Sequence, residues 1–248
     1  MSGRLVVRNF SCLKNADFRL ARVNVLIGPQ GSGKSLTAKL LYFCLELLSN
    51  FQSAAEQELP IDQYKANVGK NFSQWFPPKA WGGERFSIYF ESEQFSIRIL
   101  RRLSKGEVAD DVSVQFSPWF EEVYRWAVHL HHQQRLRIET NDAEAVSWDI
   151  DRAYRIRDMV WKRVAKDLGS GAIRSQTYIP AGRSFFTSIG RLVAGIEQGA
   201  SLDPVTIRFA RMLFALREYS ASQFYYARLG KEFLAKRKNM MMRLLGGE

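Results

Sequence analysis

A glycine-rich octapeptide near the N-terminus has the residue types and spacing of a phosphate-binding loop. The sequence GPQGSGKS, residues 28–35, places Gly28, Gly33, Lys34 and Ser35 in the pattern G-x-x-x-x-G-K-[ST]. Glycines let backbone N–H groups turn toward phosphate oxygens, the lysine supplies a cation to the β- and γ-phosphates, and the serine hydroxyl can ligate Mg²⁺. We therefore predict an ATP site with Mg²⁺, Ser35 being a metal ligand, made of Gly28, Pro29, Gln30, Gly31, Ser32, Gly33, Lys34, Ser35 and Leu36.

The segments on either side of this loop are predicted to be a buried strand and an amphipathic helix. VNVLI, residues 23–27, is continuously apolar, which is typical of a strand buried on both faces. After the loop, leucines recur at helical spacing at Leu36, Leu40, Leu41, Leu45 and Leu48. The phosphate-binding motif requires this order of strand, loop and helix, so the context favours nucleotide binding over a purely structural glycine turn.

The rest of the sequence divides into a β-rich part and a helical part. Strands are predicted at 4–10, 16–20, 85–91, 94–102 and 112–116, the third and fourth forming a hairpin, while 52–84 is weakly patterned. Helices are predicted at 117–137, 143–168 and 203–245, with a short strand near 176–180 followed by a Pro/Gly turn. The fold class is therefore α/β: a mixed sheet around the glycine-loop helix (1–116), then a basic, mainly helical region (117–248).

Over residues 4–48 the chain resembles ABC-type P-loop ATPases of the RecF, SMC and OLD (overcoming lysogenization defect) group, which are AAA-family ATP-binding proteins. The resemblance lies in LVVRNFSCLKNADFRLARVNVLIGPQGSGKS, and more weakly in the later YIPAGR at 178–183. It implies the N-terminal lobe of an ATPase head that sandwiches ATP with a second head, in DNA repair, chromosome organisation or anti-phage defence. It also implies a glutamine that senses Mg²⁺ and water. Gln115 is assigned to the metal in preference to Gln176, and Arg183 is a candidate contact to phosphate or nucleic acid.

Other motifs of such an ATPase are missing. An apolar strand ending in Asp-Glu is not found: SIYFES ends in Glu91 without the aspartate, AVSWDID is broken by Ser147, and MLFALRE has a helical pattern. In LLGGE, Leu245 stands where the signature loop needs a serine hydroxyl. We therefore expect the chain to be the N-terminal part of a longer ATPase that hydrolyses ATP only when completed by a partner or a further segment. No catalytic residue is assigned.

Composition and charge narrow the class of protein and its partners. The apolar share of 46% in 248 residues suits a globular protein. The longest apolar stretch, residues 40–48, is too short to span a bilayer, and no secretory signal is present, so we expect a cytoplasmic chain with no membrane partner. Residues 1–149 hold 18 Lys/Arg and 17 Asp/Glu, whereas 150–248 hold 18 and 8. The expected partners are a second head, as homodimer or hetero-oligomer, DNA, and an effector subunit.

The cysteines and histidines do not predict a metal site. Cys12 and Cys44 have no paired spacing and are expected to be buried free thiols. His129 and His132 share a face of a predicted helix, but no carboxylate or cysteine stands beside them in the sequence.

Two other functions fit the same loop. A P-loop kinase acting on a small molecule can lack the Asp-Glu pair and use a lid of arginines, for which RAYRIRD at 152–158 is a candidate. A non-catalytic module would keep the loop as a structural nucleotide site and bind nucleic acid through residues 150–248, with Trp148, Tyr154 and Trp161 available to stack on bases.

Overall fold

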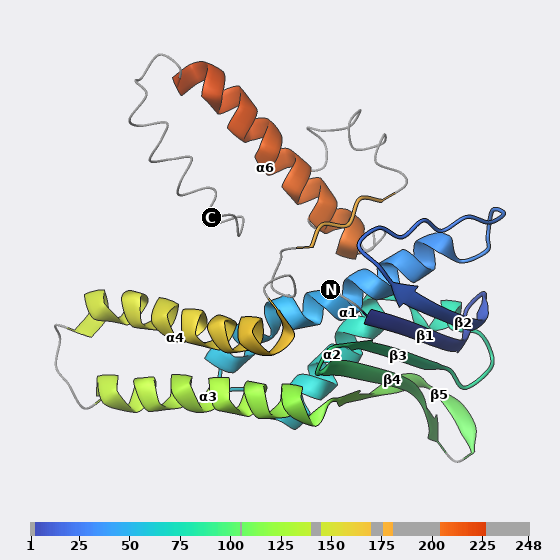
Figure 1. The fold of residues 1–248 in the computed structure, drawn as a ribbon, viewed down its shortest axis with the longest axis horizontal. Coiled ribbons are helices and arrows are strands. Elements are labelled where there is room, and N and C mark those ends of the chain that lie inside the picture. The colour runs from blue at the N-terminus through green and yellow to red at the C-terminus, as the bar shows by residue number, and fades with distance from the viewer. Residues whose placement is uncertain (1–2, 105, 140–144, 170–175, 181–203, 227–248) are drawn as a thin grey trace. The chain divides into compact units, whose positions relative to one another are not determined.

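The computed structural model describes residues 3–104, 106–139, 145–169, 176–180 and 204–226 (Figure 1). The chain falls into two compact units, residues 1–176 and 177–248.

A five-stranded antiparallel sheet forms the centre of the first unit (Figure 1). Its strand order is β2-β1-β3-β4-β5. The strands are β1 Gly3–Phe10, β2 Leu13–Leu20, β3 Ser87–Ser92, β4 Phe95–Ser104 and β5 Glu107–Phe116. Five of the predicted strands, at 4–10, 16–20, 85–91, 94–102 and 112–116, are confirmed. β2 and β5 begin earlier than expected, because the connections that precede them are only two residues long. Alternate residues such as Leu5 and Val7 are buried on the helix-covered face, which fixes the register of the pairing.

The predicted mixed sheet is wrong for the described residues. Every strand pairing there is antiparallel, and 23–27 forms no strand. A parallel neighbour requires a crossover connection that returns the chain to the same sheet. The segment from 21 to 33 leads instead from β2 directly into α1, and no described strand lies next to it to pair with its backbone.

Two helices cover one face of the sheet, and the second of them was not predicted. α1 spans Lys34–Glu56 and α2 spans Ile61–Trp75, followed by the short 3-10 helix η1 at Pro78–Ala80. α2 falls in the segment that was weakly patterned in sequence, yet its buried residues Tyr64, Val68, Phe72 and Trp75 follow helical spacing. Close packing of α2 on β5 depends on Gly69, where a Cβ atom would lie 3.3 Å from the Val112 side chain.

The predicted helices after the sheet are confirmed as an α-helical hairpin. α3 spans Pro118–Glu139 and α4 spans Ala145–Leu168. The Ser117 hydroxyl accepts a bond from the N–H of Phe120 (3.4 Å), as expected of an N-cap. The Trp119 indole N–H donates to Asp167 across the hairpin at 2.9 Å, which holds the start of α3 against the end of α4.

Aromatic side chains make up most of the core between the sheet and the helices. One group centres on Phe72, whose ring lies 4.9–6.0 Å from those of Phe10, Phe43, Phe76, Trp81 and Phe86. A second group centres on Phe120, whose ring lies 4.4–6.3 Å from those of Phe51, Tyr64, Phe95, Phe116 and Tyr124. These rings remove large apolar areas from water, so the first unit has a substantial core of its own.

The second unit is described at residues 177–180 and 204–226. Its helix α6 spans Pro204–Tyr226, within the helix predicted from 203, and Phe209 and Ala210 are buried beside Met212 and Leu213. Residues 176–180 have no regular secondary structure, so the strand predicted there is wrong. Arg183 and Leu245 lie outside the described residues. Among the helices that are described, none is long and apolar enough to cross a membrane.

Candidate phosphate-binding site

The glycine loop turns sharply before α1 begins. Gly31 and Gly33 have φ of 79° and 87°, in the left-handed region that glycine adopts without steric cost. The N–H of Ser32 donates to the carbonyl of Pro29 at 3.4 Å, which closes the turn. α1 then starts at Lys34. The two glycines therefore let the loop double back at the end of the helix.

Lys34 lies along this loop. Its ammonium group donates to the carbonyl oxygens of Gly28 at 2.7 Å and Pro29 at 2.6 Å, and to the Ser32 hydroxyl at 3.3 Å. All these contacts are solvent-exposed. The cation is thus held at the mouth of the loop, where an anion can exchange for its carbonyl partners.

The N-terminus of α1 is open. Its N-cap residue Gly33 provides no side-chain cap, and its first turn holds no acidic residue. In the described part of the chain, no hydrogen bond engages the backbone N–H groups of Gly33, Lys34 or Ser35. Such N–H groups and the positive end of the helix dipole attract anions. The Ser35 side chain is exposed beside them, as a metal ligand would need to be.

Cys12, in the β1–β2 turn, and Leu13, the first residue of β2, pack against the loop at Gly33. A Cβ atom at Gly33 would lie 2.6 Å from the Leu13 side chain and 3.1 Å from the sulfur of Cys12. Gly33 is therefore required both by its φ and by this close approach. Sequence reasoning missed these two supporting residues, since nothing in their types indicates a contact with Gly33, which is distant in the sequence. Cys12 is exposed, which corrects its expected burial. Cys44 is buried as expected, and burial raises the pKa of its thiol to about 12.

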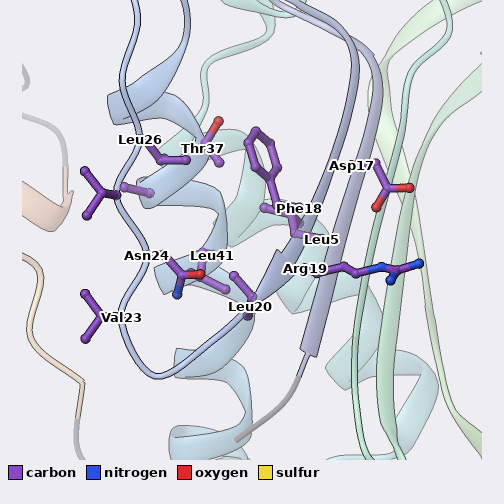
Figure 2. A pocket seen from close by; sticks show the side chains of 12 residues that line it. Leu5, Asp17, Phe18, Arg19, Leu20, Val23, Asn24, Leu26, Thr37 and Leu41 are labelled. Carbon is purple, nitrogen blue, oxygen red and sulfur yellow. The ribbon is translucent and has the colours of Figure 1, made fainter.

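The segment that enters the loop is exposed. The exposed fractions are 76% for Val23, 76% for Val25, 39% for Leu26 and 91% for Ile27, so the predicted burial of this run is wrong. A cavity of about 590 Å³ lies between the run, the β1–β2 strands and α1. Figure 2 shows Leu26 and Asn24 on the side toward α1 and Val23 on the opposite side of the segment.

Gln115, the second predicted metal ligand, is placed on another element. It lies on β5, at the edge of the sheet opposite β2, where it pairs in register with Arg98. No contact joins Gln115 to Ser35 within the described residues. Its metal role stays a prediction.

The three segments that come nearest to an apolar strand ending in Asp-Glu lie in β3, α4 and α6. Glu91 lies in β3 and accepts a bond from the Tyr89 hydroxyl at 2.8 Å. AVSWDID lies in α4 and MLFALRE in α6, both of which are helical.

The histidines of α3 lie apart from the loop. His132 Nδ1 is 2.9 Å from Glu58 Oε2, and the neighbouring Arg135 pairs with the same carboxylate at 3.0 Å. His131 is buried, which lowers its pKa and favours the neutral ring. Within the described ranges, no group of three or more His, Cys, Asp or Glu side chains could hold a metal ion.

Comparison with protein-family models, with curated proteins and with solved structures finds no match.

Proposed function

We propose that the chain binds ATP with Mg²⁺ at residues 28–36. The observation that most directly supports this site is that two sources of positive charge meet at one exposed loop. They are the Lys34 ammonium group and the N-terminus of α1, which has no side-chain cap. Polyphosphate oxygens would replace the Gly28 and Pro29 carbonyls as partners of Lys34 and would accept bonds from the free N–H groups. Ser35 would supply a hydroxyl to the metal.

We further propose that this site belongs to an ABC-type ATPase head of the RecF, SMC and OLD-like group, acting in DNA repair or anti-phage defence. The order of β1, β2, glycine loop and α1 supports this, as does the sequence resemblance over residues 4–48. The strand that the motif requires directly before the loop is not formed by residues 23–27. Hydrolysis would need groups from a second polypeptide or a further segment, because none of the described residues supplies an apolar strand ending in Asp-Glu.

Equilibrium binding of ATP, with and without Mg²⁺, tests the proposal. Lys34→Ala should weaken binding by about 10- to 150-fold, since hydrogen bonds to charged groups contribute about 1.5–3 kcal/mol. Ser35→Ala should weaken binding only when Mg²⁺ is present. Lys70→Ala removes an exposed lysine of α2 and serves as the matched control, for which binding should be unchanged. Equal affinity of Lys34→Ala and the unaltered chain would refute the ATP site.

ATP turnover tests the requirement for a second contribution. We expect the chain alone to hydrolyse ATP very slowly, and robust turnover by a dilute monomer would contradict the proposal. Release of ADP that depends on an added small-molecule acceptor would instead identify a kinase.

A further inference from the structure

Arg101, on β4, is buried although its side chain is charged. The residue is 5% exposed, and burying a charge costs free energy unless the charge is hydrogen-bonded. Its guanidinium group donates to oxygens on two separate parts of the chain. In β5 these are the Ala109 carbonyl at 2.7 Å and the Asp110 carboxylate at 3.0 Å, and in the connection 81–84, which follows η1, they are the carbonyls of Gly82 at 2.6 Å and Glu84 at 3.4 Å. Arg101 therefore ties β5 to this connection.

Trp81, the first residue of the connection, is also held by Arg101. Trp81 is fully buried, and the guanidinium carbon of Arg101 lies 5.5 Å from the centre of its ring in a cation–π contact. The indole N–H donates to the Phe76 carbonyl at 2.6 Å, and the ring packs edge-on against that of Phe86 with centres 5.2 Å apart. These contacts fix the ring and with it the backbone of Trp81.

The connection contacts the turn between β1 and β2. The N–H of Ser11 donates to the Trp81 carbonyl at 3.0 Å, and the Lys14 ammonium lies 3.6 Å from the Glu84 carboxylate. The ion pair is exposed and contributes little. Ser11 has a φ of 55°, in the left-handed region that residues with a side chain rarely adopt, so its bond to Trp81 helps to hold the turn in this conformation.

The same turn lies against the glycine loop. Cys12 and Leu13 directly follow Ser11, and both side chains pack so closely on Gly33 that a Cβ atom there would lie 2.6 Å from Leu13. The Gly33 carbonyl in turn accepts bonds from the Thr37 N–H at 2.8 Å and the Thr37 hydroxyl at 3.0 Å, in the first turn of α1. A displacement of the β1–β2 turn would therefore move the residue at which the loop ends and the helix begins.

We infer that Arg101 is a positioning residue of the phosphate-binding loop. It holds the connection 81–84, the connection holds the β1–β2 turn, and the turn sets the place of Gly33. None of the hydrogen bonds that the structure gives Arg101 reaches residues 28–36, so it acts on the loop through these intermediate contacts. The inference rests on the proposed ATP site, whose affinity is the quantity that the position of the loop would change.

Amide hydrogen exchange of the full chain without nucleotide tests the contact with the turn. Arg101→Ala leaves the carbonyls of the connection without their partner and should speed exchange of the Ser11 N–H at least about twofold relative to a control. The control is Phe120→Leu, which alters a buried ring of the other aromatic group, and urea denaturation checks that the two variants lose similar stability. Equal exchange at Ser11 in the two variants would overturn the inference.

Equilibrium binding of ATP tests the effect on the site. Arg101→Ala should weaken binding by about 2- to 30-fold, the range expected when a substitution acts on a site through intermediate contacts. Phe120→Leu should keep the affinity of the unaltered chain, because a loss of stability elsewhere in the core does not move the loop. A similar loss of affinity in both variants would assign Arg101 to stability alone.

The conservative variant Arg101→Lys supplies a second test. Lysine keeps the charge but lacks the planar fork that bonds both segments, so Ser11 exchange and ATP affinity should both lie between those of Arg101→Ala and the unaltered chain. If circular dichroism shows that Arg101→Ala is unfolded, the same two measurements on Arg101→Lys and Phe120→Leu decide the inference.

A double-mutant cycle tests whether the effect passes through the turn. Leu13→Ala removes the side chain that packs on Gly33, and its combination with Arg101→Ala should weaken ATP binding by less than the product of the two single factors. A loss equal to that product would show that Arg101 acts independently of the turn and would overturn the inference. Failure of the unaltered chain to bind ATP would instead refute the ATP site, a result distinct from equal binding by Arg101→Ala and the unaltered chain.

Discussion

The aromatic core beneath the sheet and the run Val23–Ile27 are both rich in apolar residues, but they differ in how the chain covers them. Phe72 is fully buried and touches five other rings, whereas Ile27 is 91% exposed and has no backbone partner among the described residues. In the aromatic core, the antiparallel strands and α2 bring together residues that are far apart in the sequence. The run passes from β2 to α1, and no described strand lies beside it. Apolar composition alone therefore does not decide burial; the availability of a neighbouring element does.

The largest expected effect is on the free energy of unfolding, to which the aromatic core should contribute much more than the run Val23–Ile27 does. Phe72→Ala should lower the free energy of unfolding by about 3–5 kcal/mol, because it removes a buried ring and leaves a cavity. Ile27→Ala should change it by less than about 0.5 kcal/mol, as expected for an exposed side chain. Urea denaturation of the isolated chain measures both. If Ile27→Ala destabilised the chain as much as Phe72→Ala does, the run would be buried in solution.

An intermediate effect is expected in the glycine loop, where two residues differ in their surroundings. Gly33→Ala should destabilise the loop by about 1–3 kcal/mol, because a Cβ there has an unfavourable φ and meets Leu13. Gly31→Ala has a similar φ but nothing within 4 Å of the new atom, so about 1–2 kcal/mol is expected from the backbone alone. ATP binding and urea denaturation should both rank Gly33→Ala as the more damaging. The reverse order would contradict the close packing of Leu13 against Gly33.

The smallest expected effect is the pH dependence of stability that comes from His131, a buried residue of α3. Burial lowers the pKa of its ring below the ordinary value near 6.5, so the unfolded chain binds the proton more readily. Stability should therefore fall as the pH drops below about 6.5, by at most about 1.4 kcal/mol per pH unit, until the folded-state pKa is passed. His131→Leu should flatten this part of the stability profile, whereas His129→Gln, which alters an exposed histidine, should keep it. An unchanged slope in His131→Leu would assign the pH dependence to another group.

Much of the fold and part of the site could be predicted from the sequence. The strand predicted at 4–10 corresponds to β1, and the helix predicted from residue 117 corresponds to α3, which begins at Pro118. The glycines and Lys34 predicted a loop that reverses direction and carries a cation. α2 could not be predicted with the same ease, because its polar residues and Gly69 weaken the helical pattern, while its packing on β5 stabilises it.

Local pattern determined the strands, the helix starts and the glycine loop, because hydrophobic periodicity, capping residues and backbone freedom act between residues close in the chain. Only the tertiary structure decided that the sheet is antiparallel throughout its described strands, that Cys12 and Leu13 lie under Gly33, and that 23–27 is left uncovered. These depend on which distant segments are present to pair and pack. The apolar run predicted a strand buried on both faces, and its exposure shows that none of the described elements covers it.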